Sequence, residues 1–180
     1  MRNVSAGLAA LAVASLLISP FAYAGDNNLS YLAKDDKPIK VYLKDFGNES
    51  GQSQIQPEDF KKALEHALLN RRAVNFRIAQ SAEAADIQIS ATIKKYLYSK
   101  TDPVTPSVSP WMLALDAATT ENYAEMAAEF TVTDAKTGKA LWNGTVSAFI
   151  KHMMTPAESV PKIYEKLSRV FLWKSFGKPK

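Results

Sequence analysis

Few side chains in this sequence are of the types that perform catalysis or bind metals. The chain has no cysteine, which excludes a thiolate nucleophile, a thiolate metal site and a disulfide. The two histidines, His66 and His152, have no second histidine or carboxylate at the spacing of a metal-binding motif. The stretch Lys136-Thr-Gly-Lys139 lacks the upstream glycine of a phosphate-binding loop, and we interpret it as a β-turn.

The carboxylates do not point to a reaction either. The pairs that the sequence brings together are Asp35–Asp36, Glu58–Asp59 and Glu121 with Glu125. The first pair lies in a polar stretch, the second favours a helix start, and the third has helical spacing but no other candidate group beside it. We therefore expect no enzymatic activity, no cofactor and no bound metal.

The amino-terminal residues have the three parts of a secretory signal. Arg2 precedes an apolar run from Leu8 to Ile18, and Ala22-Tyr23-Ala24 is a processing site. The run is about half of the roughly 20 apolar residues that span a membrane. We expect cleavage after Ala24 and a periplasmic product, because secreted eukaryotic domains of this size more often carry cysteines. Without a cysteine, the chain cannot be lipidated as lipoproteins are.

The charge of the chain is mildly positive. The formal net charge is +4, and lysine and arginine are spread along the sequence without a continuous basic run. This distribution argues against a nucleic-acid partner. The basic tail at 177–180 is expected to be solvated, with contact to an anionic lipid or glycan surface as the alternative.

After the signal, we expect a flexible leader over 25–37 and one domain over 38–176. Alternating apolar residues predict strands beginning near Ile39, Val74, Ile87, Met126 and Ala140. The alternation breaks at Lys94-Lys95, which predicts a bulge. The stretch Asp134-Ala-Lys-Thr-Gly138 predicts the turn of a hairpin, and Ser81–Asp86 suits one helical turn.

Two amphipathic helices complete the pattern. Pro57 followed by two acids predicts a helix from 57 to about 72. Thr155-Pro-Ala-Glu158 combines a capping box with a proline at the first helical position. The resulting order, β-α-β-β-insertion-β-β-α, predicts an α+β fold with two layers, in which both helices cover one face of a mostly antiparallel sheet of four or five strands.

Four aromatic and aliphatic residues are the candidates for contact with a partner. Trp111 and Leu115 lie in an apolar patch within a long connection, 99–125, and long connections are often functional. Trp173 and Phe176 lie just beyond the apolar stripe of the last helix. We expect these four residues to contact another protein or a membrane surface, because aromatic residues are enriched at interfaces.

Three stretches together resemble a group of small envelope proteins. They are Ile39-Lys-Val-Tyr-Leu-Lys-Asp-Phe-Gly-Asn-Glu-Ser50, Ala85-Asp86-Ile-Gln-Ile-Ser-Ala-Thr-Ile93, and Phe130-Thr-Val-Thr-Asp134-Ala-Lys-Thr-Gly138-Lys-Ala-Leu-Trp142. Their order is similar to that in penicillin-binding-protein activator lipoproteins, and next to that in lipopolysaccharide-assembly and transport-auxiliary lipoproteins. The resemblance implies a layer like the amino-terminal domain of TolB, no catalysis and docking at the outer membrane. Unlike the family, this chain lacks the lipidated cysteine.

The sequence thus predicts a secreted periplasmic accessory or adaptor protein of cell-envelope assembly, outer-membrane or cell-wall, which acts by binding envelope proteins. The alternative hypothesis is a carrier of lipid or glycolipid. That alternative requires an apolar pocket between the sheet and the helices.

Overall fold

The computed structural model of the protein describes residues 29–33, 37–100, 122–151 and 155–177. Its elements are, in chain order, the 3₁₀-helix η1 (Leu29–Ala33), β1 (Ile39–Asn48), α1 (Pro57–Leu69), β2 (Phe76–Ile78), β3 (Ile87–Lys100), β4 (Asn122–Asp134), β5 (Ala140–Lys151) and α3 (Pro156–Phe176). The predicted order of strands and helices is confirmed.

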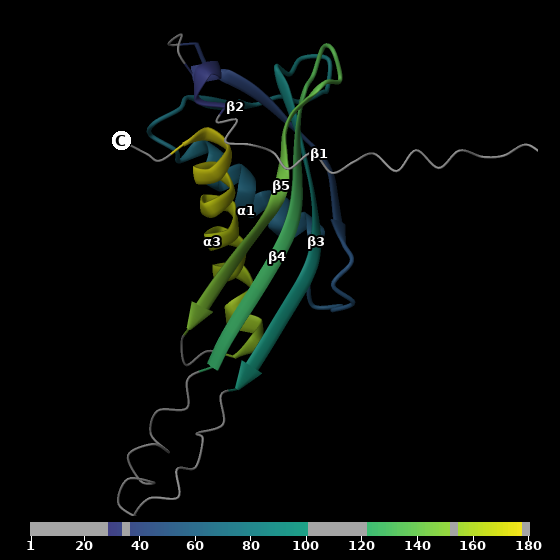
Figure 1. The fold of residues 1–180 in the computed structure, drawn as a ribbon, viewed down its shortest axis with the longest axis vertical. Helices are drawn as coiled ribbons and strands as arrows, with labels where there is room; N and C mark the ends of the chain where they lie inside the picture. The colour runs from purple at the N-terminus through teal and green to yellow at the C-terminus, as the bar shows by residue number, and fades with distance from the viewer. Residues whose placement is uncertain (1–28, 34–36, 101–121, 152–154, 178–180) are drawn as a thin grey trace, which may run out of the picture.

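The five strands form one sheet in the order β2-β1-β3-β4-β5. β1 is parallel to both of its neighbours, whereas the long strands β3, β4 and β5 pair antiparallel. Both helices lie on one face of this sheet (Figure 1). The predicted α+β class with a mostly antiparallel sheet is therefore correct, and the parallel pairing of β1 with β2 follows from the crossover helix α1 between them.

The alternation of apolar residues decides which face of each strand is covered. In β1, Ile39, Val41 and Leu43 are buried, whereas the side chain of Lys40 is exposed. The same alternation continues through β3, β4 and β5, so their buried residues share one face. The predicted break is also present, because the register of β3 and β4 shifts between Ile93 and Lys95.

Aromatic rings fill the space between the sheet and the helices. Phe130, in the middle of β4, stacks on Phe171 of α3 with ring centroids 4.1 Å apart. Phe60 of α1 meets Phe130 edge-on at 5.8 Å. All three side chains are at most 1% exposed. One ring of the sheet thus anchors both helices, and each such pair adds about 0.5–1.5 kcal/mol beyond the area that it buries.

Two helix boundaries differ from the prediction. α1 ends at Leu69, not near 72, and Asn70 is its C-cap. The side-chain amide of Asn70 donates to the carbonyl oxygen of His66, which also accepts the last helical bond from the main-chain N–H of Asn70. Ser81–Asp86 forms bends and turns but no helix. Asp86 is instead tied to β1, where its main chain and its carboxylate both pair with the main chain of Lys40.

α3 begins where the capping box predicts. The Thr155 hydroxyl accepts from the N–H of Glu158, and the Glu158 carboxylate accepts in return from the N–H of Thr155. The helix continues to Phe176. Trp173 and Phe176 therefore belong to the helix, which corrects the expectation that they follow it.

Part of the expected leader is ordered. Leu29–Ala33 forms η1, and Leu29 is 1% exposed, within the core.

The long connection is shorter than the predicted 99–125, because β3 extends to Lys100 and β4 begins at Asn122. Trp111 and Leu115 lie outside the described residues, as does the signal segment.

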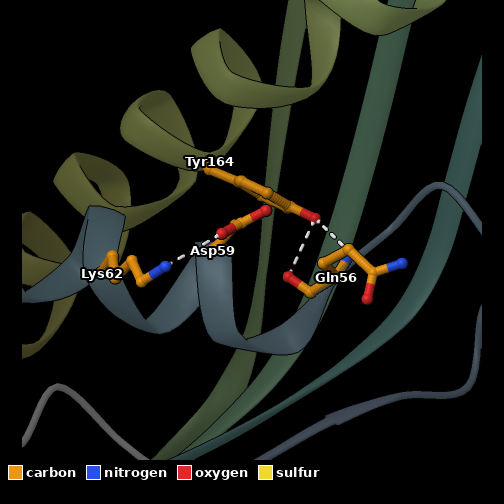
Figure 2. Close-up of polar contacts among 4 residues, drawn as sticks. All are labelled: Gln56, Asp59, Lys62 and Tyr164. Carbon is orange, nitrogen blue, oxygen red and sulfur yellow. Dashed lines mark hydrogen bonds and ion pairs between the residues drawn. The ribbon is translucent and has the colours of Figure 1, made fainter.

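A tyrosine joins the two helices at the start of α1. The Tyr164 hydroxyl of α3 accepts from the N–H of Gln56 at 3.0 Å and donates to the Gln56 carbonyl at 3.2 Å (Figure 2). Gln56 is the N-cap of α1, but its side chain caps no N–H of the helix. Tyr164 therefore provides a fixed partner for the main chain at this helix start.

Replacement of Tyr164 by phenylalanine removes both bonds and leaves the ring. We expect Tyr164→Phe to lower the free energy of unfolding by about 1–2 kcal/mol, since the N–H of Gln56 loses its partner and the Gln56 carbonyl keeps only the N–H of Phe60. Urea denaturation measures the change. Tyr31→Phe, at a tyrosine that is 48% exposed, is the control and should change the stability by less than about 0.5 kcal/mol.

The same tyrosine should make stability depend on alkaline pH. Burial raises the pKa of Tyr164 to about 12, whereas an unfolded tyrosine has a pKa of about 10. Between these values the unfolded chain loses this proton and the folded chain keeps it, so the stabilisation is complete below pH 10 and is lost as the pH rises to 12. The stability advantage of the native protein over Tyr164→Phe should shrink across that range. Parallel curves for the two proteins would contradict this assignment.

Candidate functional site: a basic groove between the two helices

The four residues predicted to contact a partner differ in their location and exposure. Trp173 is 47% exposed on the outer side of α3. Phe176 is 2% exposed and packs edge-on against Phe76 of β2 at 5.0 Å, so its ring belongs to the core. Trp111 and Leu115 fall outside the described residues, and their role stays a prediction.

Trp173 borders an open groove of about 1000 Å³ between α1 and α3. Two contacts show that the helices run in the same direction there: Gln56 meets Tyr164 at one end, and Arg71 meets Gly177 at the other. The groove is lined by Ala63, His66, Ala67, Asn70, Arg71, Arg72, Ile150, Lys162, Glu165, Lys166, Arg169, Val170, Leu172 and Trp173. Because the lining includes Ile150 of the edge strand β5, the groove reaches from the outer side of the helices to the edge of the sheet.

The charge of this groove is strongly unbalanced. Among the described residues, its lining has one carboxylate and five cationic side chains: Arg71, Arg72, Lys162, Lys166 and Arg169. That carboxylate, on Glu165, pairs with Arg169 at 3.2 Å. The Lys166 ammonium donates to a main-chain carbonyl of the edge strand β5, which leaves its charge uncompensated. The groove thus favours an anionic occupant.

Arg71 is the least solvated of these cations. Its Nη2 donates to the carbonyl oxygen of Gly177, whereas its Nε is buried without a hydrogen-bond partner. Desolvation lowers the pKa of Arg71 below its usual value. No carboxylate among the described residues forms an ion pair with it. A partly dehydrated and unmatched guanidinium binds an anion more strongly than an exposed one.

The sequence analysis missed the cations of the groove because they do not form a continuous run. Lys162, Lys166 and Arg169 lie one helical turn apart on α3, and this spacing was a readable signal. Arg71 and Arg72 come from the end of α1, far away in the sequence. Only the packing of the two helices brings the two groups to one surface.

A second hollow in the described part of the chain is bordered by carboxylates that bond to the main chain. A smaller hollow of about 270 Å³ is bordered by Asp86 and Asp134. Asp86 holds β1, and Asp134 accepts from main-chain N–H groups of the 134–138 turn, which lower its pKa. Within the described ranges, no group of three or more metal-ligating side chains occurs.

Comparison with known proteins connects the fold to a solved structure. No protein-family model matches the sequence, and no curated protein is similar to it. The structure is similar to the PelC dodecamer from Paraburkholderia phytofirmans, with a TM-score of 0.52 and 15% identity over 77% of this chain and 89% of that chain. At this identity, the similarity shows a shared fold.

Weaker similarities include bacterial lipoproteins. The lipoprotein GNA1162 from Neisseria meningitidis has a TM-score of 0.41 and 14% identity, over 69% of this chain and 92% of that one. The LpoB C-terminal domain from Salmonella enterica has a TM-score of 0.37 and 10% identity, over 66% of this chain and 90% of that one.

If the Arg71 charge serves binding, its removal should not weaken the fold. We expect Arg71→Met to unfold with a free energy within about 1 kcal/mol of the native value or above it, because a dehydrated cation is replaced by an apolar chain of similar length at the loss of one hydrogen bond. Urea denaturation of this variant beside Arg72→Met, at the exposed neighbour, is the measurement. A loss of more than about 2 kcal/mol, confined to Arg71→Met, would show that the charge is structural.

Proposed function

We propose that this chain is an exported, non-enzymatic accessory protein of the bacterial cell envelope that acts by binding another protein through the groove between α1 and α3. The observation that carries the proposal is the cluster of five cations that the described residues bring to the groove. Arginine is one of the residue types that most often dominate the energy of protein interfaces.

The chemistry of the groove supports binding over catalysis. Its lining combines five cations, one carboxylate paired to Arg169, and the imidazole of His66. General acid–base or nucleophilic catalysis needs a reactive group held by a second group, and no hydrogen bond of that kind joins the described groove residues. The described groups are therefore suited to electrostatic recognition.

The envelope assignment rests on the secretory signal over 1–24 and on the resemblance of three sequence stretches to envelope lipoproteins. Within the described residues, no helix is long and apolar enough to cross a membrane. The similarity to PelC supports the fold alone, and the binding surface must be argued from this chain's own side chains.

The alternative of a lipid carrier has less support. A carrier needs an apolar cavity between the sheet and the helices. In this structure the rings of Phe60, Phe130 and Phe171 fill the middle of that space. The groove on the outer side of the helices is open and basic, which suits the acyl chains of a lipid poorly.

Photocrosslinking in intact cells tests the proposed function. With a photoreactive phenylalanine analogue in place of Trp173, we expect one defined envelope protein in the adduct, because this position borders the groove. The same analogue in place of Leu97, which is 39% exposed on the other face of the sheet, is the control and should give no such adduct. Equal adducts at both positions, or none at Trp173, would contradict the proposal. Mass spectrometry of the adduct identifies the partner and shows whether the mature chain begins at Gly25.

A further inference from the structure

We propose that the edge strand β5 binds an extended segment of the partner protein as a sixth strand of the sheet, and that this segment carries acidic side chains at alternate positions. This inference rests on the proposed function, because it names the form in which a protein partner binds beside the groove. Three properties of β5 support it: its length at the edge, the direction of its main-chain groups and the charges around it.

β5 is a long edge strand without the usual protection. It covers Ala140–Lys151 at the border of the sheet, on the side of α3, and β4 is its only strand neighbour in the described part of the chain (Figure 1). Residues 141–150 include no proline and no charged side chain. The opposite edge strand, β2, is only three residues long. Proteins commonly shorten or charge the edges of their sheets, which prevents pairing with other strands. Of the two edges, only β2 is protected in this way.

One contact shows which main-chain groups of β5 point outward. In an antiparallel ladder, alternate residues direct both their N–H and their C=O to the same neighbouring strand. The Phe149 carbonyl accepts from the ammonium of Lys166 in α3, so it points away from β4. The register of β5 against β4 has no shift from position 142 to 151. The same outward direction therefore holds for the main chains of Asn143, Thr145 and Ser147.

The two faces of an added strand would meet different side chains. On the outer face of the sheet it would lie beside Thr145, Ser147 and Phe149, which are exposed and uncharged. On the inner face it would lie beside the cations of α3, because Ile150 and Lys166 line the same groove. Side chains alternate between the two faces of a strand. Acids at every second position would therefore all face α3.

The charges around this edge favour an acidic segment. Positions 135–157, which include all of β5, hold three lysines and no aspartate or glutamate. In the free protein, Lys166 occupies the outward carbonyl of Phe149. When an N–H of the added strand replaces it there, the released ammonium can pair with one of the acids. A strand with alternate acids is thus attracted to this edge, and a basic strand is repelled.

Other occupants match these properties less well. A second copy of this chain would bring the same lysines and no acid to the edge, so like charges would gather there. An anionic polysaccharide or membrane surface would neutralise the cations, but it offers no ladder of donors and acceptors to the outward main chain. An extended peptide meets both requirements, as in other complexes in which a peptide adds to an exposed sheet edge.

The test uses the full chain and a peptide of about eight residues, the length of one strand, in which glutamates alternate with valines. One control peptide has the same composition with the glutamates in a block. In a second control the valines are N-methylated, which removes main-chain donors but keeps every charge. Fluorescence anisotropy of the labelled peptides measures affinity. We expect the alternating peptide to bind at least tenfold more tightly than either control.

Amide hydrogen exchange, followed by NMR, locates the bound peptide. In the free protein, the amides of Thr145 and Ser147 should exchange at least tenfold faster than those of Val146 and Ala148, because only the latter two bond to β4. The alternating peptide should slow the exchange of Thr145 and Ser147 at least tenfold and leave Val146 and Ala148 nearly unchanged. A ligand that lies over the groove alone would not produce this alternation.

Two pairs of variants separate strand addition from attraction of anions in general. Thr145→Pro removes one outward N–H and leaves the bonds to β4, so it should reduce the affinity at least tenfold. Thr145→Ala keeps that N–H and is the matched control. Lys166→Glu should also reduce the affinity at least tenfold, whereas Lys40→Glu makes the same change of charge on β1 and should have little effect. Thermal unfolding by circular dichroism shows that each variant is folded. If Thr145→Pro does not fold, the exchange pattern decides alone.

The opposite results are equally clear. Equal affinity for the alternating and the N-methylated peptide, full binding by folded Thr145→Pro, or protection that does not alternate along β5 would overturn strand addition. Protection of Thr145 and Ser147 that rises with protein concentration, without peptide, would show that a second copy is the occupant. Tighter binding to phosphatidylglycerol vesicles, unchanged by Thr145→Pro, would show an anionic surface instead. If these results appear while crosslinks at Trp173 persist, the added strand is wrong and the adaptor function stands.

Discussion

The structure depends on one ring in the middle of the sheet. Phe130 of β4 contacts Phe171 of α3 on one side and Phe60 of α1 on the other. These contacts hold both helices on the same face of the sheet, and the size of the rings sets the distance between the helices and the sheet. Because the apolar stripes of the two helices are used against the sheet, their outer sides are left for solvent or for a partner.

The groove is a consequence of this arrangement. α1 and α3 lie side by side and run in the same direction, and the bonds between Tyr164 and Gln56 fix their relative position at one end. At the other end, Arg71 reaches the main chain at Gly177. Side chains on two packed helices are held more rigidly than side chains on loops, so the cations keep a defined spacing.

The similarity to PelC shows that this chain has a known fold, but it does not identify a partner. At 15% identity, the similarity shows a shared fold, and a shared fold does not carry over the residues of a binding surface. The chemistry of recognition must therefore be read from Arg71, Lys162, Lys166, Arg169 and Trp173 themselves.

Local patterns in the sequence determined most of the fold. The period of two in β1, the capping box at Thr155 and the turn that ends at Gly138 each depend on neighbouring residues, so all three were predicted correctly. The same local reasoning placed Trp173 at a surface. It could not place Phe176, whose burial depends on Phe76, or Leu29, whose burial depends on packing against the core.

The groove itself was decided by the tertiary structure alone. Periodicity tells which face of a helix is apolar, but it does not tell which other helix lies beside it. In the sequence, the strands β2 to β5 lie between Arg71 and Lys162. The two residues line one groove only because Phe130 holds both helices against the same sheet. The individual charges could be read from the sequence, whereas their gathering on one surface depends on how the two helices pack.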